Sequence, residues 1–286
     1  MSEGKIIVNG PKFRSKDRVR ADRTDQMYEH IPEGDTLVKI ENLNVTYRTD
    51  KTETVAVNDI SFDIKKGELL SIVGPSGCGK STILRCIGGL LQQTSGTISI
   101  GDNQCTTAGS DRGMVFQDFA LFPWRTVRQN IEFGLEVAGV SKEERRERSD
   151  KYLKAMGLAE YGDHRIHELS GGMKQRVGIA RAMIMHPALI LMDEPFGALD
   201  AQTRNILQQS LVEVLNNSHR TIVFVTHSVE EAIYLSDRIL VLSKRPATIH
   251  KIIEVPGDRP RDLNAPEYIE LKNRILEYLE SQNTIF

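Results

Sequence analysis

Hydrophobic and polar positions follow two different periods along the chain. Residues 37–47 and 55–64 alternate apolar and polar side chains with the period of two that is typical of half-buried strands. Residues 68–73 form a more continuous apolar run, which indicates a buried strand. The other predicted strands are 113–116, 189–192, 221–226, 238–242 and 248–255. Helical spacing fills most of the intervals, as in residues 201–215, so we expect a mainly parallel sheet covered by helices on both faces.

One stretch interrupts this rhythm. Residues 118–168 contain almost no strand signal, and residues 126–138 and 141–156 have helical patterns. The second of these helices is highly charged, which indicates a solvated face. The economical interpretation is a helical subdomain, about residues 118–185, inserted into an α/β core.

The two ends differ from this core, which spans residues 37–245. Residues 1–36 are basic and polar with little apolar periodicity, which predicts a disordered extension, with a partner-binding or membrane-surface arm as the alternative. Residues 246–286 predict a strand and a last helix that begins at Asn264, where Glu267 completes a capping box. The apolar face of that helix consists of Tyr268, Leu271, Ile275, Tyr278 and Leu279.

Composition narrows the class of protein. The chain has 286 residues, enough for about two domains or one elaborated domain. Its 37 basic and 39 acidic residues give a net charge of −2, which argues against a nucleic-acid partner held by phosphate contacts. No run approaches the ~18–20 apolar residues that cross a bilayer, so this chain by itself is not a channel or permease. Three cysteines without C-x-x-C spacing favour a reducing cytoplasm over a disulfide scaffold.

A phosphate-binding loop follows the buried strand 68–73. The sequence between Gly74 and Ser81 fits G-x-x-x-x-G-K-[ST], with a helical pattern directly after it. Glycines let backbone N–H groups converge on phosphate oxygens, and the following helix N-terminus favours anions. We expect Lys80 to reach the β/γ-phosphates and the Ser81 hydroxyl to bind Mg²⁺. The predicted loop residues are Gly74, Pro75, Ser76, Gly77, Cys78, Gly79, Lys80, Ser81 and Thr82.

The apolar strand 189–192 ends in two acids that complete such a site. Asp193 would join the Mg²⁺ shell, and Glu194 would accept a proton from the attacking water. Together the two motifs predict a site that binds and hydrolyses ATP with Mg²⁺.

A third motif carries a family resemblance. The sequence Leu-Ser-Gly-Gly-Met-Lys-Gln-Arg at 169–176 resembles the signature motif of ATP-binding cassette (ABC) ATPases, and the resemblance extends over about residues 37–245. It implies a P-loop NTPase core with an inserted helical subdomain and an antiparallel β subdomain. It further implies that Tyr47 stacks on adenine, Gln117 touches Mg²⁺ and the attacking water, and His227 contacts the γ-phosphate.

The same resemblance implies a second nucleotide contact across a dimer. Ser170, Gly171 and Gly172 open a helix, whose N–H groups form an anion site. In the family, this site faces the ATP of a second copy of the chain, and the loop at 198–200 that ends in Asp200 crosses to the other protomer. ATP would therefore hold a closed dimer that hydrolysis releases.

Subgroup cues resemble the ATPase subunits of nitrate, sulfonate, taurine and bicarbonate importers. These cues lie at 112–127, 193–200, 230–238 and 243–249. The resemblance implies transmembrane permease subunits, a periplasmic or lipid-anchored solute-binding protein, and a peripheral location on the cytoplasmic face of the inner membrane. Of the apolar residues Phe119, Leu121, Phe122 and Trp124, we expect at least one aromatic to dock a permease helix, with internal packing as the alternative.

Other function classes stay open to different degrees. An importer ATPase for another small solute is one alternative, and a soluble ABC ATPase without a transport role is another. The DNA-repair type would need long coiled coils or zinc modules in residues 118–168, which the sequence does not offer. A P-loop GTPase would carry Asn-Lys-x-Asp, and that tetrapeptide does not occur. A binding module without catalysis would not need both Glu194 and His227.

Overall fold

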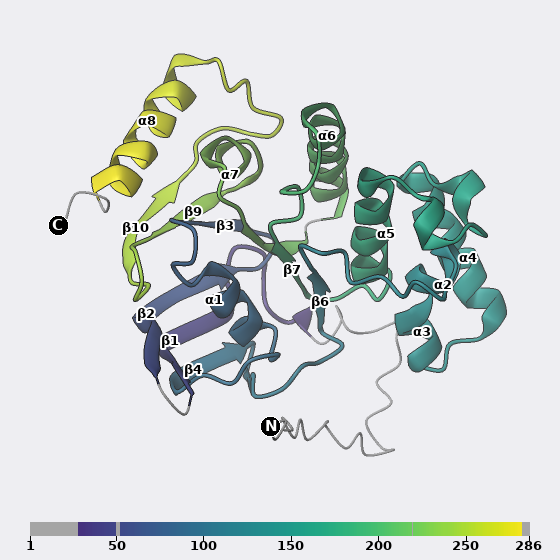
Figure 1. Cartoon of the computed structure of the whole chain (residues 1–286), viewed down its shortest axis with the longest axis horizontal. Coiled ribbons are helices and arrows are strands. Elements are labelled where there is room, and N and C mark those ends of the chain that lie inside the picture. Colours follow the sequence, from purple (N-terminus) through teal and green to yellow (C-terminus); the bar gives the residue numbers. More distant parts are fainter. Residues whose placement is uncertain (1–27, 50–51, 219, 282–286) are drawn as a thin grey trace, which may run out of the picture.

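The computed structural model describes residues 28–49, 52–218 and 220–281, and in this part of the chain six strands form the central sheet. Their order is β10-β9-β3-β8-β7-β6 (Figure 1). The parallel strands are β3 (Leu69–Val73), β6 (Arg112–Val115), β7 (Leu189–Asp193), β8 (Thr221–Val225) and β9 (Arg238–Leu242). The edge strand β10 (Ile249–Glu254) is antiparallel to β9. The predicted parallel sheet is therefore confirmed.

The two faces of this sheet pack against different elements. In β7, Leu189 and Leu191 belong to an apolar cluster that includes helix α1 (Lys80–Ile87), while Ile190 and Met192 belong to one that includes α5 (Gly171–Met183) and α6 (Ala201–Ser218). Successive side chains of a strand point to opposite faces. Helices α1 and α5 therefore cover opposite faces of the sheet, as Figure 1 shows.

A second sheet covers the α1 side. Its order is β2-β1-β4-β5, from β1 (Thr36–Arg48), β2 (Glu53–Lys65), β4 (Ser95–Ile100) and β5 (Asn103–Gln104), with antiparallel pairing. This is the antiparallel β subdomain that the resemblance implies. The sequence did not predict β4, because Ile98 and Ile100 are its only buried side chains and Gly96 weakens the strand pattern.

The helical subdomain contains α2 (Val127–Ile131), α3 (Phe133–Val137), α4 (Lys142–Ala155), and the short turns η2 (Ala159–Tyr161) and η3 (Ile166–Glu168). Thr126 caps α2 with a capping box, and Ser141 caps α4. The helix expected over 126–138 is interrupted at Glu132. The carboxylate of Glu132 accepts a hydrogen bond from Ser149 of α4 at 2.7 Å, so this position ties the two helices together.

The C-terminal segment packs on α7 (Val229–Leu235). Helix α8 (Pro266–Ser281) buries Tyr268, Leu271 and Ile275 against α7, β9 and β10, as its apolar face predicts. The helix begins at Pro266 rather than at Asn264, so the predicted capping box is wrong. Proline suits the first position of a helix because it lacks an N–H, and Asn264 instead donates to Asp262.

One buried side chain joins this segment to α7. Arg261 is 6% exposed and donates to the carbonyls of Ile233 (2.9 Å), Ser236 (2.8 Å) and Gly257 (2.9 Å). Burial lowers the pKa of this guanidinium from its usual value. The carbonyls at the C-terminus of α7 are thus bound by a residue of the β10–α8 connection.

Packing begins upstream of Leu37. Residues 1–27 of the expected extension lie outside the described residues. Tyr28 is 2% exposed, and its hydroxyl donates to Asp111 at 3.0 Å. The Lys66 ammonium donates to the carbonyls of Tyr28 (2.9 Å) and Ile31 (2.6 Å). The segment from Tyr28 is therefore part of the folded unit.

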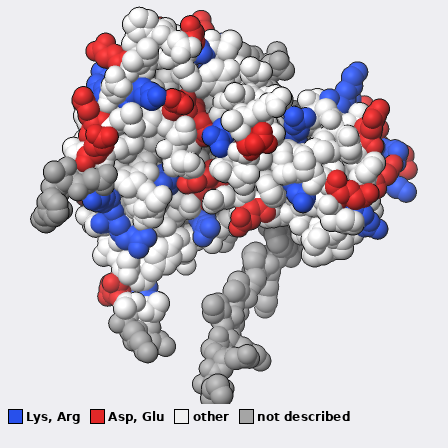
Figure 2. Space-filling model, turned by 45° about the horizontal axis from the view of Figure 1, so that its top comes forward, with Lys and Arg blue, Asp and Glu red and all other residues white. Residues whose placement is uncertain are grey.

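The surface mixes charges of both signs. Figure 2 shows Lys and Arg interspersed with Asp and Glu over the face that it presents. Such a mixture gives no extended field of one sign on that face. None of the helices in the described part of the chain combines the length and apolar character that a bilayer crossing requires.

Candidate nucleotide site

The carboxyl ends of the parallel strands bring the predicted site residues to one edge of the sheet. In the register, Ile72 of β3 and Asp193 of β7 both pair with Val225 of β8, and Val115 of β6 pairs with Met192 of β7. The residues that follow these strands are Gly74 after β3, His227 after β8, Glu194 after β7 and Gln117 after β6. Ligands of open parallel sheets bind at this edge.

The phosphate loop is the turn between β3 and α1. Gly77 and Gly79 have φ values of +71° and +129°, which L side chains rarely adopt. No side chain caps the N-terminus of α1, so the first-turn N–H groups are available to an anion. Lys80 is 5% exposed, and its ammonium donates to the carbonyls of Gly74 (2.9 Å) and Pro75 (3.1 Å). These contacts hold the charge within the loop.

Two oxygen-bearing side chains meet beside this loop. The Ser81 hydroxyl donates to Asp193 at 2.8 Å, and Asp193 is 4% exposed. Burial raises the pKa of Asp193, and the hydrogen bond from Ser81 acts in the opposite direction. Mg²⁺ prefers such hard oxygen donors and takes its other ligands from phosphates and water. No cluster of three or more His, Cys, Asp or Glu side chains suited to a metal occurs among the described residues.

Glu194 lies in contact with the predicted histidine. Glu194 Oε2 and His227 Nδ1 are 3.0 Å apart, and the Glu194 side chain is 20% exposed. The backbone of Glu194 has a φ of +43°, an unfavourable conformation for a residue with a Cβ. The Glu194 N–H donates to the Val225 carbonyl at 3.0 Å, which holds this conformation in place. The strand end therefore holds the Glu194 carboxylate beside His227.

The loop after Gln117 is fastened to α5. Gln117 itself is exposed at the end of β6. Phe119 and Ala120 have φ values of 60° and 45°, and their carbonyls accept hydrogen bonds from Arg181 at 3.0 and 2.7 Å. A displacement of the helical subdomain would therefore move the segment that carries Gln117.

Tyr47 lies beside the start of α1. Its hydroxyl is 3.1 Å from the Thr82 hydroxyl, and the residue is 41% exposed. The side chain is thus tethered at its polar end next to the phosphate loop, with much of its surface available to a base.

The signature residues form a separate cluster. Ser170 caps α5, and its hydroxyl accepts from the Met173 N–H at 3.4 Å. A Cβ on Gly172 would lie 2.2 Å from Thr203 at the start of α6, so the glycine permits close packing there. Asp200 accepts from the Thr203 N–H at 3.0 Å, and such backbone bonds lower the pKa of Asp200. The signature and the loop ending at Asp200 are therefore neighbours.

The structure does not bring the signature to the phosphate loop of the same chain. Ser170 opens α5, whereas Lys80 opens α1, and these helices cover opposite faces of the sheet. A single chain thus presents two separate anion-binding helix ends.

Sequence reasoning missed one side chain at the phosphate loop. Arg245, in the connection between β9 and β10, donates to the Gly77 carbonyl through Nε (3.0 Å) and Nη2 (2.7 Å). A hollow of about 520 Å³ lies between Pro75, Ser76, Gly77, Lys244 and Arg245. Arg245 lies in the subgroup cue at 243–249, but no contact with the phosphate loop was predicted for it, and the available signal was its position after the strand that neighbours β3.

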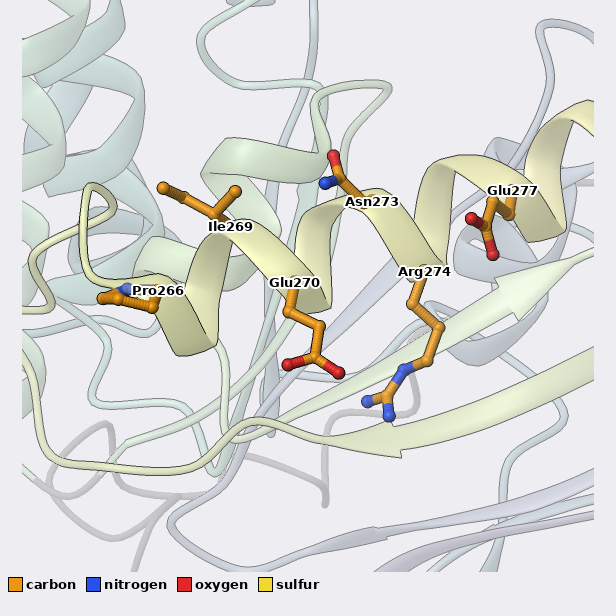
Figure 3. A pocket seen from close by; sticks show the side chains of 6 residues that line it. All are labelled: Pro266, Ile269, Glu270, Asn273, Arg274 and Glu277. Carbon is orange, nitrogen blue, oxygen red and sulfur yellow. The ribbon is translucent and has the colours of Figure 1, made fainter.

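Another hollow, of about 530 Å³, lies along α8 (Figure 3). All six lining residues come from this one helix: Pro266, Ile269, Glu270, Asn273, Arg274 and Glu277. A binding site usually needs polar groups that converge from several elements. The strand ends meet this condition, and the surface of α8 does not.

Comparisons with known proteins agree with this geometry. A family model described as ABC transporter matches residues 57–197. An uncharacterised ABC transporter ATP-binding protein of Methanocaldococcus jannaschii is 45% identical over 245 residues, covering 86% of this chain and 92% of that protein. The nitrate import ATP-binding protein of Synechocystis is 43% identical over 256 residues, covering 86% and 96%. A solved dimeric ATP-binding cassette in a post-hydrolysis state with ADP and Pi has a TM-score of 0.69 and 35% identity, covering 77% of this chain and 99% of that one. The fold class that the sequence predicts is thereby confirmed.

Proposed function

Because this chain is an ATP-hydrolysing member of the ABC transporter family, we propose that it drives the import of a small anion through a membrane permease. The observation that carries the proposal is the bond between Ser81 and Asp193 beside the loop that holds Lys80, with Glu194 next in sequence. These groups come from the end of β7 and from the start of α1, and the fold brings them to one place.

Each residue near the loop has a defined part in this proposal. Tyr47 stacks on adenine, while the loop N–H groups and Lys80 bind the phosphates. Ser81, Asp193 and Gln117 hold Mg²⁺, which supplies neutralisation of charge on the β- and γ-phosphates. Glu194 accepts the proton of the attacking water, and the adjacent His227 contacts the γ-phosphate.

The active unit in this proposal is a dimer. Helices α1 and α5, which follow the phosphate loop and the signature, cover opposite faces of the sheet, so the Ser170 end of α5 is suited to close the ATP site of a second copy. The dimeric state of the solved relative supports this arrangement. ATP then holds the dimer closed, and hydrolysis weakens the contact.

The relatives support the proposed solute and location. The similarity to a nitrate import protein supports a small anion such as nitrate, bicarbonate or an organic sulfonate. The chain would act at the cytoplasmic face of the inner membrane, bound to permease subunits that receive solute from a periplasmic or lipid-anchored binding protein.

Lys80→Ala tests the site directly. The substitution removes charge-assisted contacts to the β/γ-phosphates, so we expect ATP turnover of the purified chain to fall more than about tenfold. Lys251→Ala, which removes an exposed lysine of β10, is the matched control and should leave turnover unchanged. Wild-type turnover in Lys80→Ala would place the ATP site elsewhere.

A further inference from the structure

The segment that follows β9 lies against the back of the phosphate loop. Three glycines of the loop each contact a different residue of this segment, and the contacts follow the same order along both. The pairs are Gly74 with Leu242, Gly77 with Arg245, and Gly79 with Ala247. The register explains this order. Val73 of β3 pairs with Val241 of β9, and the two parallel strands then end side by side, so the segments that follow them run next to each other.

Two of the contacts depend on the missing side chain of glycine. A Cβ on Gly74 would lie 3.1 Å from the Leu242 Cβ, and one on Gly79 would lie 3.2 Å from the Ala247 Cβ. Both distances are shorter than ordinary van der Waals contact. The backbone of these two glycines therefore packs directly against the Cβ atoms of the segment, so a change in one affects the packing of the other.

The segment is itself anchored independently of the loop. Ala247 is fully buried, its N–H donates to the Ala56 carbonyl, and its carbonyl accepts from the Asn58 N–H, both at 2.9 Å. At the other side, Ser243 and Thr248 bond to each other through backbone and side chain. The backbone on both sides of Arg245 is thus held in place by hydrogen bonds, in part to the second sheet.

The third contact, between Arg245 and Gly77, consists of hydrogen bonds. Two N–H groups of the Arg245 guanidinium converge on the Gly77 carbonyl, at 3.0 and 2.7 Å. This carbonyl belongs to the peptide that links Gly77, with its φ of +71°, to Cys78 inside the loop. These bonds hold the plane of that peptide, whose N–H donates to the Pro75 carbonyl at 3.2 Å. Arg245 therefore stabilises the shape of the loop, and that shape determines where the other loop N–H groups point.

We propose that Arg245 is a positioning residue for ATP, which fixes the Gly77–Cys78 peptide so that the phosphate loop is preorganised for the triphosphate. The inference rests on the proposed function, because it assumes that ATP binds at this loop. Arg245 acts through the loop, so its loss weakens ATP binding and leaves the chemistry at Glu194 intact. Preorganisation lowers the ordering cost of binding.

The test compares three variants of the full chain by KM and kcat for ATP. Arg245→Ala removes both bonds and should raise KM about tenfold with kcat within about twofold. Lys244→Ala is the matched control, because it removes an exposed cation from the same hollow without touching a Gly77 bond, and should raise KM less than about threefold. Arg245→Lys keeps the charge but not the fork of N–H groups, so its KM should lie between these two.

The salt dependence of KM distinguishes a positioning role of Arg245 from a general effect of its positive charge. The effect of Lys244→Ala should fade as salt is raised from about 0.05 to 0.5 M, whereas most of the Arg245→Ala effect should persist. Equal KM values for the two alanine variants, or a wild-type KM in Arg245→Ala, would overturn the inference. If the inference about Arg245 fails but Lys80→Ala loses ATP binding, the proposed function still stands. If Lys80→Ala also binds ATP normally, the proposed function itself fails.

Discussion

Trp124 offers the sharpest test of how this subunit engages a permease. The residue is 69% exposed on the helical subdomain, next to Phe122 with ring centroids 5.5 Å apart. Phe122 itself packs inward, 4.6 Å from the Phe133 ring and under the Arg181 guanidinium. Of the aromatic residues that the sequence singled out, Trp124 is exposed, whereas Phe119 and Phe122 are half-buried, so Trp124 is the most accessible to a partner. We predict that Trp124→Ala weakens permease docking and leaves the isolated subunit intact.

The magnitude follows from the exposed area. A tryptophan side chain buries ~150–250 Å² when fully covered, so the exposed part of Trp124 amounts to about 100–170 Å². At ~25 cal/mol per Å², covering it on docking contributes about 3–4 kcal/mol. Less than a third of the residue is covered in the isolated chain, so its removal costs at most about 1–2 kcal/mol of folding stability. The Arg165 bond to the Trp124 carbonyl is unaffected by the substitution.

The assay is solute-stimulated ATP turnover of the reconstituted transporter, beside basal turnover and thermal unfolding of the isolated subunit. Stimulated turnover and co-purification with the permease should fall, with docking weakened by about 2 kcal/mol or more, while basal turnover is retained. Leu90→Ala is the control, because Leu90 is 50% exposed and follows α1 on the opposite face of the sheet. Intact transport in Trp124→Ala refutes the docking role. Unfolding of the isolated variant would instead identify Trp124 as a core residue.

Two further predictions concern hydrolysis and dimer closure. Glu194→Gln keeps the shape of the side chain but cannot accept a proton, so ATP should bind and a dimer should accumulate in size-exclusion chromatography with ATP. A variant that stays monomeric and still hydrolyses ATP would contradict the assignment of the base. Ser170→Arg places a bulky cation at the start of α5, so ATP binding to the isolated chain should survive while turnover fails, as measured by nucleotide binding and phosphate release. Loss of ATP binding would show that the signature does not act across a dimer.

The strands and the strand-end residues could be predicted because they depend on local patterns. Runs such as 189–192 are apolar throughout, and the two acids that follow them identify the active edge of the sheet. Strand β4 was missed because its pairing with β1, Val38 with Ile100, is decided by tertiary contacts and not by its own pattern. The start of α8 had two possibilities in the sequence, a capping box that begins at Asn264 or a proline at the first helical position, Pro266. The sequence alone does not decide between them.

In the candidate site too, some residues could be predicted from local motifs and others depend on tertiary contacts. The roles of Lys80 and Asp193 follow from motifs whose spacing is fixed by the chemistry of phosphate and Mg²⁺. Arg245 lies 168 residues from Gly77 in the sequence, and only the parallel register of β3 and β9 brings the two together. Likewise, only the packing of Phe122 against Phe133 tells which aromatic of the 119–124 run stays exposed. Contacts of this kind are set by the fold as a whole.

The bonds that Arg261 makes to the end of α7 have a consequence for how the protein opens. Because one guanidinium binds carbonyls of both α7 and the β10–α8 connection, we expect the two elements to open together in amide hydrogen exchange. Helix α7 begins two residues after His227. A protease cut or an inserted tag within residues 256–262 would therefore loosen the helix that follows His227, although the cut itself lies in the C-terminal segment.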